Sequence, residues 1–254
     1  MLPTLPLGPL ALPTAPLVYI LGVWLALFAV DRAARRLGLD PETHYALAAA
    51  GLLGGFLGAR LVFILLHWSS YDNLLGILWP LNSGYNTLGG LLIGAAAAFF
   101  YGRWRRLPLW PTLDVLAPGL LVFLIAVSLA DFLGGPGYGS LTGVPWGVTQ
   151  FGVRRHAVQL YEALVGLAAL GAWWTATSDL TGFGKPVRSQ DAGRPFLWAV
   201  IVYAGGRLLV DAYRENAPLM AGGLHVVQMV ALGVLILGLI ALARIPREQM
   251  DPSS

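Results

Sequence analysis

The chain has 254 residues, of which 57% are hydrophobic and only 11% are charged. Soluble domains carry roughly 25% charged residues, so this composition argues against a soluble domain and favours a polytopic membrane protein. The absence of cysteine excludes disulfides, a thiol nucleophile, a cysteine metal site and a cysteine-anchored lipoprotein. The formal charge of +3 is modest, and we expect no nucleic-acid partner.

Seven apolar segments, each close to one membrane thickness, follow one another along the chain. The N-terminal stretch MLPTLPLGPLALPTAP lacks the basic region of a cleaved signal peptide, so we expect the first span to be retained. The sequence predicts an all-α, polytopic integral membrane protein with about seven transmembrane helices in a single membrane domain, residues 1–254. The predicted helices cover residues 15–30, 45–67, 86–102, 112–133, 157–176, 196–213 and 224–244.

Two glycine-rich stretches predict close contacts between helices. The segment GLLGGFLGAR, residues 51–60, has the small-residue spacing that lets membrane helices approach one another. In YNTLGG, residues 85–90, we expect Asn86 to cap a helix and Gly89 and Gly90 to pack against a neighbour. The aromatic-rich segment between them, residues 67–85, is predicted to be an outer loop lying in the membrane interface.

Most basic residues fall on one side of the seven predicted helices. Eleven of the 16 do so: Arg32, Arg35, Arg36, Arg103, Arg105, Arg106, Lys185, Arg188, Arg194, Arg244 and Arg247. By the positive-inside rule this side is cytoplasmic. We therefore expect the N-terminus outside the cell and the C-terminus in the cytoplasm.

The other five basic residues are all arginines, and each falls within a helix or on its outer half. They are Arg60, Arg154, Arg155, Arg207 and Arg214. Arginine binds phosphate in a planar, two-pronged way, and charges inside a membrane are costly, so we take those that are present to be functional by default. Each arginine alone could snorkel or pair with an acid. For five on one side, we favour a binding site for an anionic group.

The segment VYAGGRLLVDAYREN, residues 202–216, carries the strongest polar pattern. Tyr203, Arg207, Asp211 and Arg214 are spaced by four, four and three residues, which predicts one polar stripe on a helix. Arg207 and Asp211 form an i,i+4 pair that can partly neutralise each other. The alternative to a functional stripe is a buried ion pair that joins two helices.

The segment RRHAVQLYEALVG, residues 154–166, takes further polar groups into the next predicted helix. Gln159 and Glu162 share a helix face, and His156 lies one turn earlier on its edge. His156 alone would be read as an ordinary interfacial histidine. Together with the flanking arginines it indicates the lining of a cavity on the outer side.

Asp131 lies near the end of the fourth predicted helix, ahead of a glycine-rich outer loop covering residues 134–156. Its carboxylate could pair with Arg207 or Arg60, or cap the loop. All these polar groups face the same outer leaflet. Together they indicate an arginine-rich site whose natural occupant is an anionic phospholipid head group.

Several of these segments resemble the prolipoprotein diacylglyceryl transferase family. RRHAVQLYEAL is similar to the family segment RHPSQLYE, and GGRLLVDAYREN to its FRxxxExxR helix. GLLGGFLGARLVFILL, NTLGGLLIG and ADFLGGPGYG…VPWG resemble three further family segments, in order along nearly the whole chain. The match retains Gly139, His156, Gln159, Tyr161, Glu162, Tyr203 and Arg207.

The chain also departs from the family pattern. Leu88 stands where the family has a histidine, Ser128 where it has an arginine, and Pro136 where it has a glutamate. Asp131 replaces an asparagine, Asp211 replaces a glutamate, and a tyrosine of the first helix falls near Ala15.

The resemblance implies an enzyme of the bacterial cytoplasmic membrane that needs no cofactor or metal. Such an enzyme transfers diacylglycerol from phosphatidylglycerol to the lipobox cysteine of a prolipoprotein, and glycerol 1-phosphate leaves. Arg207, helped by Arg154 or Arg155, would bind the phosphate, and His156 or Asp211 would serve as base. The expected substrate-binding residues are Arg60, Asp131, Gly139, Arg154, Arg155, Gln159, Tyr161, Glu162, Tyr203 and Arg214.

Two alternatives stay open. The chain could be a non-catalytic relative that binds anionic lipid or a membrane partner. It could also be a transferase with a different donor or acceptor.

Overall fold

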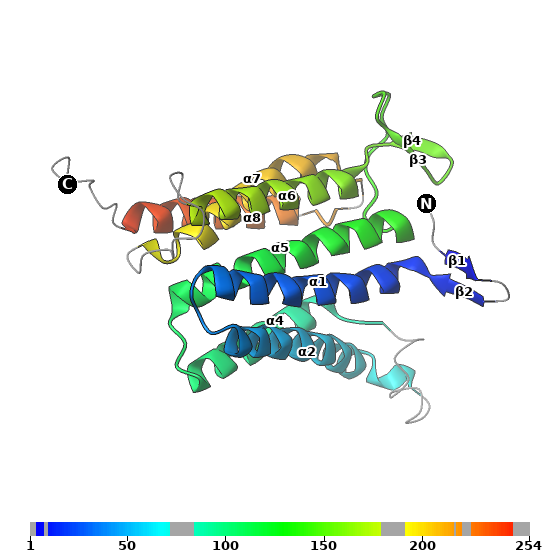
Figure 1. Cartoon of the computed structure of the whole chain (residues 1–254). Coiled ribbons are helices and arrows are strands. Elements are labelled where there is room, and N and C mark those ends of the chain that lie inside the picture. The colour runs from blue at the N-terminus through cyan, green and yellow to red at the C-terminus, as the bar shows by residue number, and fades with distance from the viewer. Residues whose placement is uncertain are drawn as a thin grey trace. The chain divides into compact units, whose positions relative to one another are not determined.

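Seven α-helices of 17 to 26 residues dominate the part of the chain that the structure describes. In this computed structural model, that part comprises residues 4–7, 10–71, 84–178, 191–215, 217–219 and 225–245 (Figure 1). The helices are α1 (Thr14–Arg36), α2 (Pro41–Leu66), α4 (Thr87–Trp104), α5 (Leu109–Gly134), α6 (Val158–Thr177), α7 (Arg194–Val210) and α8 (Val226–Arg244). Each predicted apolar segment coincides with one of them, so the all-α prediction is confirmed.

Within the residues that the structure describes, five segments are long and apolar enough to cross a membrane: α1, α2, α5, α8, and α7 extended to Tyr213. The chain is therefore an integral membrane protein. The two other long helices, α4 and α6, are more polar at one end. Helix α6 begins with Gln159, Tyr161 and Glu162, whereas α4 ends with Tyr101, Arg103 and Trp104.

The chain divides into two compact units. The smaller unit, Asp40–Leu109, is built on the packing of α2 against α4. A Cβ atom on Gly94 would lie 2.8 Å from the carbonyl oxygen of Gly51 and 3.0 Å from the Cα of Gly55. The predicted close helix contact is confirmed, because only glycine allows the two backbones to come this near.

Both of these helices start after a residue whose side chain caps them, and of the two caps only Asn86 was predicted. The Asn86 side chain accepts a 2.7 Å hydrogen bond from the Gly89 amide at the start of α4. Helix α2 begins at Pro41, after Asp40, whose carboxylate accepts from the Glu42 and Thr43 amides. The Thr43 hydroxyl also donates to this carboxylate. Its hydrogen bond, and to a smaller extent the two amide bonds, hold the pKa of Asp40 below its usual range. The 3-10 turn η1 (Trp68–Ser70) follows α2, and most of the predicted interfacial loop lies outside the described residues.

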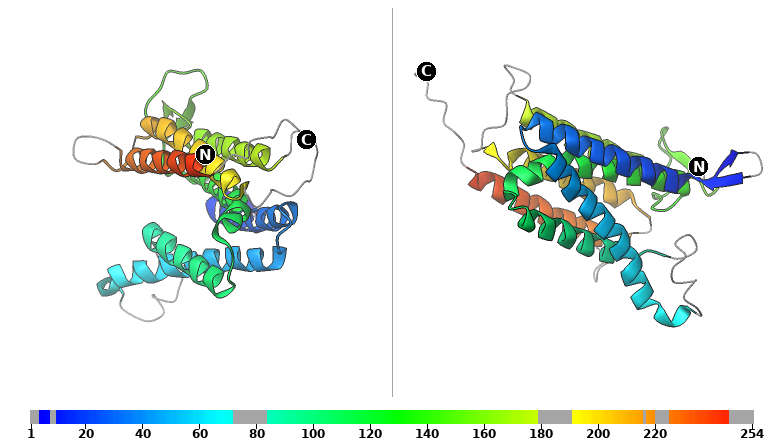
Figure 2. Two further views of the ribbon diagram at one scale, coloured as in Figure 1. Left: turned by 90° about the vertical axis from the view of Figure 1, so that its left-hand side faces the viewer. Right: turned by 60° about the horizontal axis from the view of Figure 1, so that its bottom comes forward.

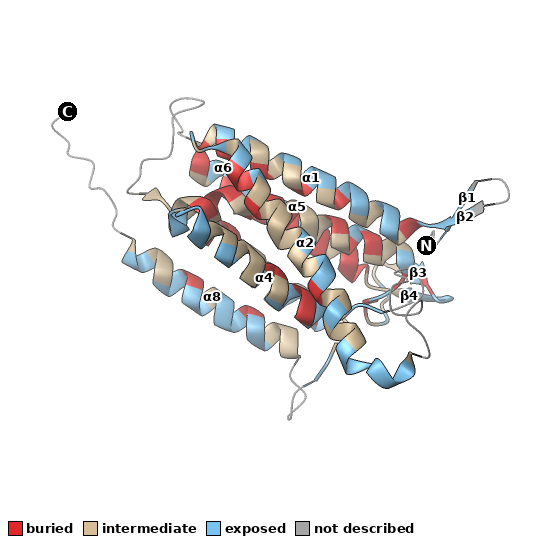
Figure 3. Cartoon of the chain, turned by 90° about the horizontal axis from the view of Figure 1, so that it is seen from below, coloured by how far each residue is buried: buried red, intermediate tan, exposed pale blue. Residues whose placement is uncertain are grey.

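The larger unit comprises Met1–Leu39 and Trp110–Ser254. Helix α1 packs against α5 at a small-residue contact, where Gly22 faces Ala126. Helix α7 packs against both α6 and α8, and Figure 2 shows these three helices as neighbours in two further views. Much of the surface of α8 is exposed, whereas α5 carries many buried residues (Figure 3).

Asp114 fixes the start of α7 from the neighbouring α5. Its buried carboxylate accepts hydrogen bonds from the backbone amides of Gly193, at 2.6 Å, and Phe196, at 2.9 Å. Its backbone carbonyl accepts a third, from the Trp173 indole of α6, at 2.8 Å. Asp114 therefore caps a helix that lies far along the chain and ties three helices together.

Two short hairpins were not predicted from the sequence. Strands β1 (Thr4–Leu7) and β2 (Leu10–Pro13) pair antiparallel ahead of α1. Strands β3 (Val148–Gln150) and β4 (Val153–Arg155) pair within the predicted glycine-rich loop, with Gln150 opposite Val153. The two-residue turn of this second hairpin has positive φ at Phe151 and Gly152, the geometry that suits a tight hairpin.

Candidate active site

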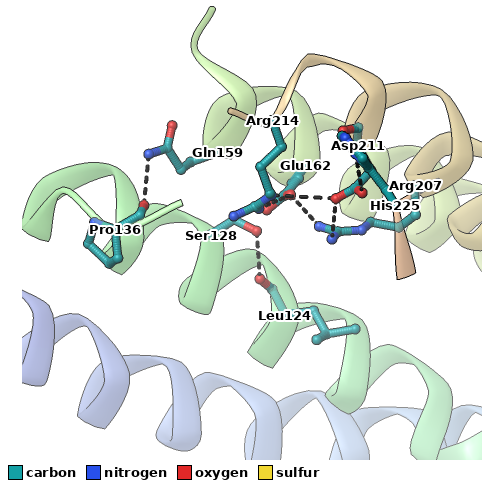
Figure 4. Close-up of polar contacts among 9 residues, drawn as sticks. All are labelled: Leu124, Ser128, Pro136, Gln159, Glu162, Arg207, Asp211, Arg214 and His225. Carbon is teal, nitrogen blue, oxygen red and sulfur yellow. Dashed lines mark hydrogen bonds and ion pairs between the residues drawn. The ribbon is translucent and has the colours of Figure 1, made fainter. Parts of the chain in front are cut away.

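Glu162 of α6 is the centre of a four-charge cluster, which consists of Glu162, Arg207, Asp211 and Arg214. Its Oε1 atom forms ion pairs with Nη1 of Arg207 and with Nη2 of Arg214 (Figure 4). Asp211 Oδ1 lies 3.6 Å from Nη2 of Arg207 and 3.5 Å from Nε of Arg214. The cluster thus joins the RRHAVQLYE and GGRLLVDAYREN segments, which the sequence analysis had singled out separately.

The cluster is buried and balanced in charge. The side chains of Glu162 and Asp211 are 4% and 0% exposed, and those of Arg207 and Arg214 are 17% and 16% exposed. Two carboxylates therefore face two guanidinium groups in a site with little water. The predicted i,i+4 pair of Arg207 and Asp211 is confirmed, and part of each guanidinium's charge is already compensated within the protein.

The polar stripe does not continue along one helix as predicted. Helix α7 ends at Val210, and residues 211–213 form the 3-10 turn η3 (Asp211–Tyr213). Arg214 follows in an extended conformation and pairs with Gly139 in an antiparallel bridge. This change of backbone direction lets the Arg214 side chain reach Glu162, a contact that uniform helical spacing could not predict.

His225 joins this cluster at its other edge, and the sequence analysis missed it. Its Nδ1 atom lies 3.0 Å from the carbonyl oxygen of Asp211 and 3.3 Å from Oδ2 of the Asp211 carboxylate. His225 immediately precedes α8, within the last predicted apolar segment. Its polar side chain in that position was the signal that could have identified it.

Residues 138–142 of the glycine-rich loop form the scaffold around the cluster. Along one edge of this segment, the Ser140 amide donates to the Tyr213 carbonyl, at 2.8 Å. Along its opposite edge, the Ser140 carbonyl accepts from the His156 amide, at 3.0 Å. The Thr142 amide continues this side by donating to the Arg154 carbonyl, at 3.1 Å. The loop therefore lies as an extended strand between the end of η3 and the start of α6.

Gly139 stands at the tightest point of this scaffold. A Cβ atom there would overlap the carbonyl oxygen of His156 and lie 2.7 Å from Cγ2 of Val158. A side chain at residue 139 would thus force the loop away from α6. Gly139 is a residue retained in the family match, and this close approach gives the physical reason for glycine at this position.

His156 lies just before α6, between two tyrosines. Its Nδ1 atom is 3.4 Å from the Tyr161 hydroxyl, and its ring centroid is 4.8 Å from that of Tyr213. The prediction placed His156 and Tyr161 at one site, and the structure brings them into contact. Tyr213 was not predicted as a site residue.

The two arginines of strand β4 differ in their surroundings. Arg154 is exposed and donates to the Pro145 carbonyl, at 2.6 Å. Arg155 donates to the Gly139 carbonyl, at 3.0 Å, and its guanidinium lies 4.6 Å from the centre of the Tyr138 ring. Neither arginine forms an ion pair within the described residues, in contrast to Arg207 and Arg214.

Three further predicted residues lie in the same unit. Gln159 is fully buried and donates from Nε2 to the Pro136 carbonyl, at 3.0 Å. The charges of Glu162 and Arg214 act on both Tyr203 and Asp131. Asp131 accepts a 3.1 Å hydrogen bond from the hydroxyl of Tyr19.

Tyr19 is another residue that the sequence analysis missed. It lies one helical turn after Ala15, the position matched to the family tyrosine, and therefore on the same face of α1. Pairing with Arg207 was one of three roles that the sequence left open for Asp131, and within the described residues no such ion pair forms.

Arg60 belongs to the smaller unit. Its Nη1 atom lies 3.4 Å from the Tyr71 hydroxyl and 3.4 Å from the Gly84 carbonyl. Its predicted role in the same binding site stays a prediction.

The amino-acid sequence of the chain also matches those of known proteins. Residues 4–244 match the family model described as prolipoprotein diacylglyceryl transferase. The chain belongs to this family. Similar members, each named phosphatidylglycerol–prolipoprotein diacylglyceryl transferase, come from Geobacter sulfurreducens and Symbiobacterium thermophilum. The first is 32% identical over 93% of this chain and 92% of its own, and the second is 30% identical over 96% and 94%.

The relative from Synechococcus elongatus is 28% identical over 93% of this chain and 84% of its own. The family assignment made from motifs is therefore confirmed, together with its enzyme class. Two positions where the chain departs from the family motifs carry small or apolar side chains. Ser128 donates only to the Leu124 carbonyl of its own helix, and Leu88 is exposed.

Proposed function

We propose that this protein transfers diacylglycerol from phosphatidylglycerol to the lipobox cysteine of a prolipoprotein, at the outer face of the bacterial cytoplasmic membrane. The main support is the four-charge cluster, in which Glu162 brings two family-like segments together through Arg207 and Arg214. His225 contacts the cluster directly at Asp211, and Gly139, whose carbonyl accepts from Arg155, forms a bridge with Arg214.

Unpaired polar atoms around the cluster match the head group of this donor lipid. Nε of Arg155 is a buried donor without a hydrogen-bond partner in the described residues, and Oε1 of Gln159 is a buried acceptor of the same kind. Such atoms are costly, so their presence favours a site that meets a polar ligand. Phosphatidylglycerol offers phosphate oxygens to the donor and glycerol hydroxyls to the acceptor.

Arg155 is our choice for the main phosphate ligand. The charges of Arg207 and Arg214 are compensated by Glu162 and Asp211, whereas among the described residues Arg155 contacts a carbonyl and an aromatic ring and no carboxylate. An uncompensated guanidinium gives the strongest attraction for an anion. Arg207 then acts through the cluster, as a positioning residue that also contributes positive charge nearby.

Asp211 is poorly suited to be the base that ionises the thiol. It is fully buried, and its two carboxylate oxygens already contact Arg207, Arg214 and His225. A carboxylate held in this way orients its neighbours more readily than it takes a proton. His156, whose Nδ1 atom faces the Tyr161 hydroxyl, stays a candidate base.

The second candidate function is binding of anionic lipid without transfer. The observation in its favour is the loss of charged or titratable groups at Leu88, Ser128 and Pro136, which stand at family motif positions. The same site would then hold phosphatidylglycerol while the carbon–oxygen bond stays intact.

We also propose that all seven long helices cross the membrane, with the N-terminus outside and the C-terminus in the cytoplasm. The positions of the arginines support this orientation. It places the glycine-rich loop and the four-charge cluster on the outer side.

A mass-shift experiment tests the proposed activity. Purified protein in detergent is mixed with phosphatidylglycerol and a lipobox peptide with one cysteine, and the peptide is weighed by mass spectrometry. We expect a gain of one diacylglycerol and release of glycerol phosphate. No gain, in parallel with an active relative such as the Geobacter sulfurreducens protein, together with retained lipid binding, would select the second candidate.

A further inference from the structure

The pairing of His225 with Asp211 has the arrangement of a general base and its orienting carboxylate. We propose that His225 takes the proton from the acceptor thiol, and that Asp211 is the positioning residue behind it. This inference rests on the proposed transferase function. It assigns a role to a histidine that none of the matched motifs contains.

The contacts of His225 fix which ring nitrogen is basic. Nδ1 lies 3.0 Å from the Asp211 carbonyl and 3.3 Å from its carboxylate, and both of these groups can only accept a hydrogen bond. Nδ1 therefore carries the proton in the neutral ring, and Nε2 presents its lone pair. Within the described residues no hydrogen bond engages Nε2, and the side chain is 20% exposed.

The two oxygens of the Asp211 carboxylate contact different partners. Oδ2 faces the histidine, whereas Oδ1 faces Arg207 of α7 and Arg214 beyond η3, at 3.6 and 3.5 Å (Figure 4). Glu162 of α6 in turn compensates both arginines. The cluster thus holds the Asp211 carboxylate in place beside the ring, where it can balance the positive charge of a protonated His225.

The backbone around His225 is held on both sides. His225 pairs with Leu219 in an antiparallel bridge, and the Val226 amide donates to the Pro218 carbonyl, at 3.0 Å. One turn into α8, Gln228 donates from Nε2 to the Leu208 carbonyl of α7, at 3.0 Å. These contacts hold the ring against Asp211 and limit the rearrangement needed before reaction.

The other histidines are less suited to this task. His44 and His67 belong to the smaller unit, and the Nδ1 atom of each contacts a carbonyl of its own helix region. His156 faces the hydroxyl of Tyr161, which can donate or accept and so does not fix a tautomer. Leu88, at the family histidine position, cannot accept a proton.

The proposed step conserves atoms and electrons. The S–H bond of the acceptor cysteine breaks, and its proton moves to Nε2 of His225. The sulfur electron pair forms a C–S bond to the diacylglycerol carbon as the C–O bond to phosphate breaks, with its electrons passing to the phosphate oxygen. The proton then leaves Nε2 for the departing glycerol phosphate, directly or through water, and the ring returns to its neutral form.

The test compares two acceptor peptides that differ in one atom, a lipobox cysteine peptide and its selenocysteine analogue. A selenol is a stronger acid than a thiol and ionises at neutral pH without a base. His225→Asn keeps a donor towards Asp211 but removes the basic nitrogen, and His225→Gln serves as a second variant in case the first does not fold. His67→Asn is the matched control, because His67 is exposed and lies outside the site.

We expect His225→Asn to lower kcat/KM for the cysteine peptide by about 10²–10⁴-fold, the usual contribution of a general base. The selenocysteine peptide should react at the wild-type rate, and His67→Asn should change neither. The cysteine defect should shrink as the pH rises towards about 8.5, where the thiol ionises unaided. Thermal unfolding should be cooperative in all variants.

Other outcomes contradict the inference. An unchanged cysteine rate in folded His225→Asn and His225→Gln would overturn it, as would an equal loss with both acceptors. Selenol rescue of His156→Asn, without rescue of His225→Asn, would assign the base to His156. A wild-type protein that transfers to neither acceptor would instead overturn the proposed function.

Discussion

The Glu162 carboxylate on α6 forms a buried ion pair with the Arg207 guanidinium on α7, and the two side chains are only 4% and 17% exposed. Such a pair stabilises a structure only as a pair, because either charge alone in a site with little water carries a large desolvation cost. Arg214 shares the same carboxylate oxygen. One glutamate therefore controls the charge balance of the whole cluster.

Glu162→Gln should destabilise the protein strongly, because it leaves two partly buried arginines with the more distant Asp211 as their remaining carboxylate in the cluster. We expect a loss of about 3–5 kcal/mol in the free energy of unfolding, measured by thermal or denaturant unfolding in detergent. The control is Arg35→Gln, which breaks the exposed 2.9 Å pair with Asp31 and should leave the unfolding temperature unchanged. Equal effects of the two changes would contradict a buried, interdependent cluster.

Gly139→Ala should push the glycine-rich loop away from α6, since the new methyl group overlaps the His156 carbonyl. We expect about 1–3 kcal/mol of destabilisation from overpacking, and loss of transfer activity in the mass-shift assay. Gly143→Ala is the matched control, because nothing lies within 4 Å of its added methyl group. If Gly139→Ala behaves like this control, the loop does not make the close contact described here.

Arg155→Gln should weaken the use of phosphatidylglycerol while the protein stays folded. Loss of a hydrogen bond to a charged group corresponds to about 1.5–3 kcal/mol, or roughly a 10- to 100-fold rise in KM for the lipid. The adjacent Arg154→Gln, whose guanidinium is exposed, should have a much smaller effect. A larger rise in KM for Arg154→Gln than for Arg155→Gln would move the phosphate contact to the exposed arginine.

Asp114→Ala should loosen the start of α7, because two buried backbone amides lose their acceptor. We expect a loss of about 1–3 kcal/mol, seen as a lower unfolding temperature. Trp173→Phe removes only the indole donor to the Asp114 carbonyl and should cost less. The capping role would be wrong if the alanine variant unfolded at the wild-type temperature.

The absence of cysteine makes the proposed topology simple to test, because each introduced thiol reports a single position. Gly143→Cys should react in intact cells with a maleimide that cannot cross the membrane. Glu42→Cys, at the exposed start of α2, should react only after the membrane is opened. The reverse pattern would invert the proposed orientation.

The helices could be predicted from sequence because each is a run of apolar residues about as long as the membrane is thick. The glycine contact between α2 and α4 was also predictable, since residues 51–58 place small side chains on turns that meet a neighbour. The hairpins were not, because β3 and β4 have only three residues each. Strands this short leave no alternating pattern to detect.

The site was predicted as a set of residues, but not as a network. Local spacing correctly paired Arg207 with Asp211, because a helix fixes neighbours four residues apart. Local spacing could not predict the ion pair of Arg214 with Glu162 or the contact of His225 with Asp211. Both contacts depend on how α6, α7 and α8 pack against one another. Tyr19 was missed for a similar reason, because its partner Asp131 lies on α5.

The ion pair between Glu162 and Arg207 also bears on how the chain enters the bilayer during synthesis. Helix α6 emerges from the ribosome first, carrying Glu162 and Gln159 near its outer end, and it is not among the five described segments that length and composition suit to crossing a membrane. Helix α7 follows with the arginines that neutralise this carboxylate. We therefore expect α6 to partition into lipid together with α7, whose arginines supply the counter-charge that Glu162 needs.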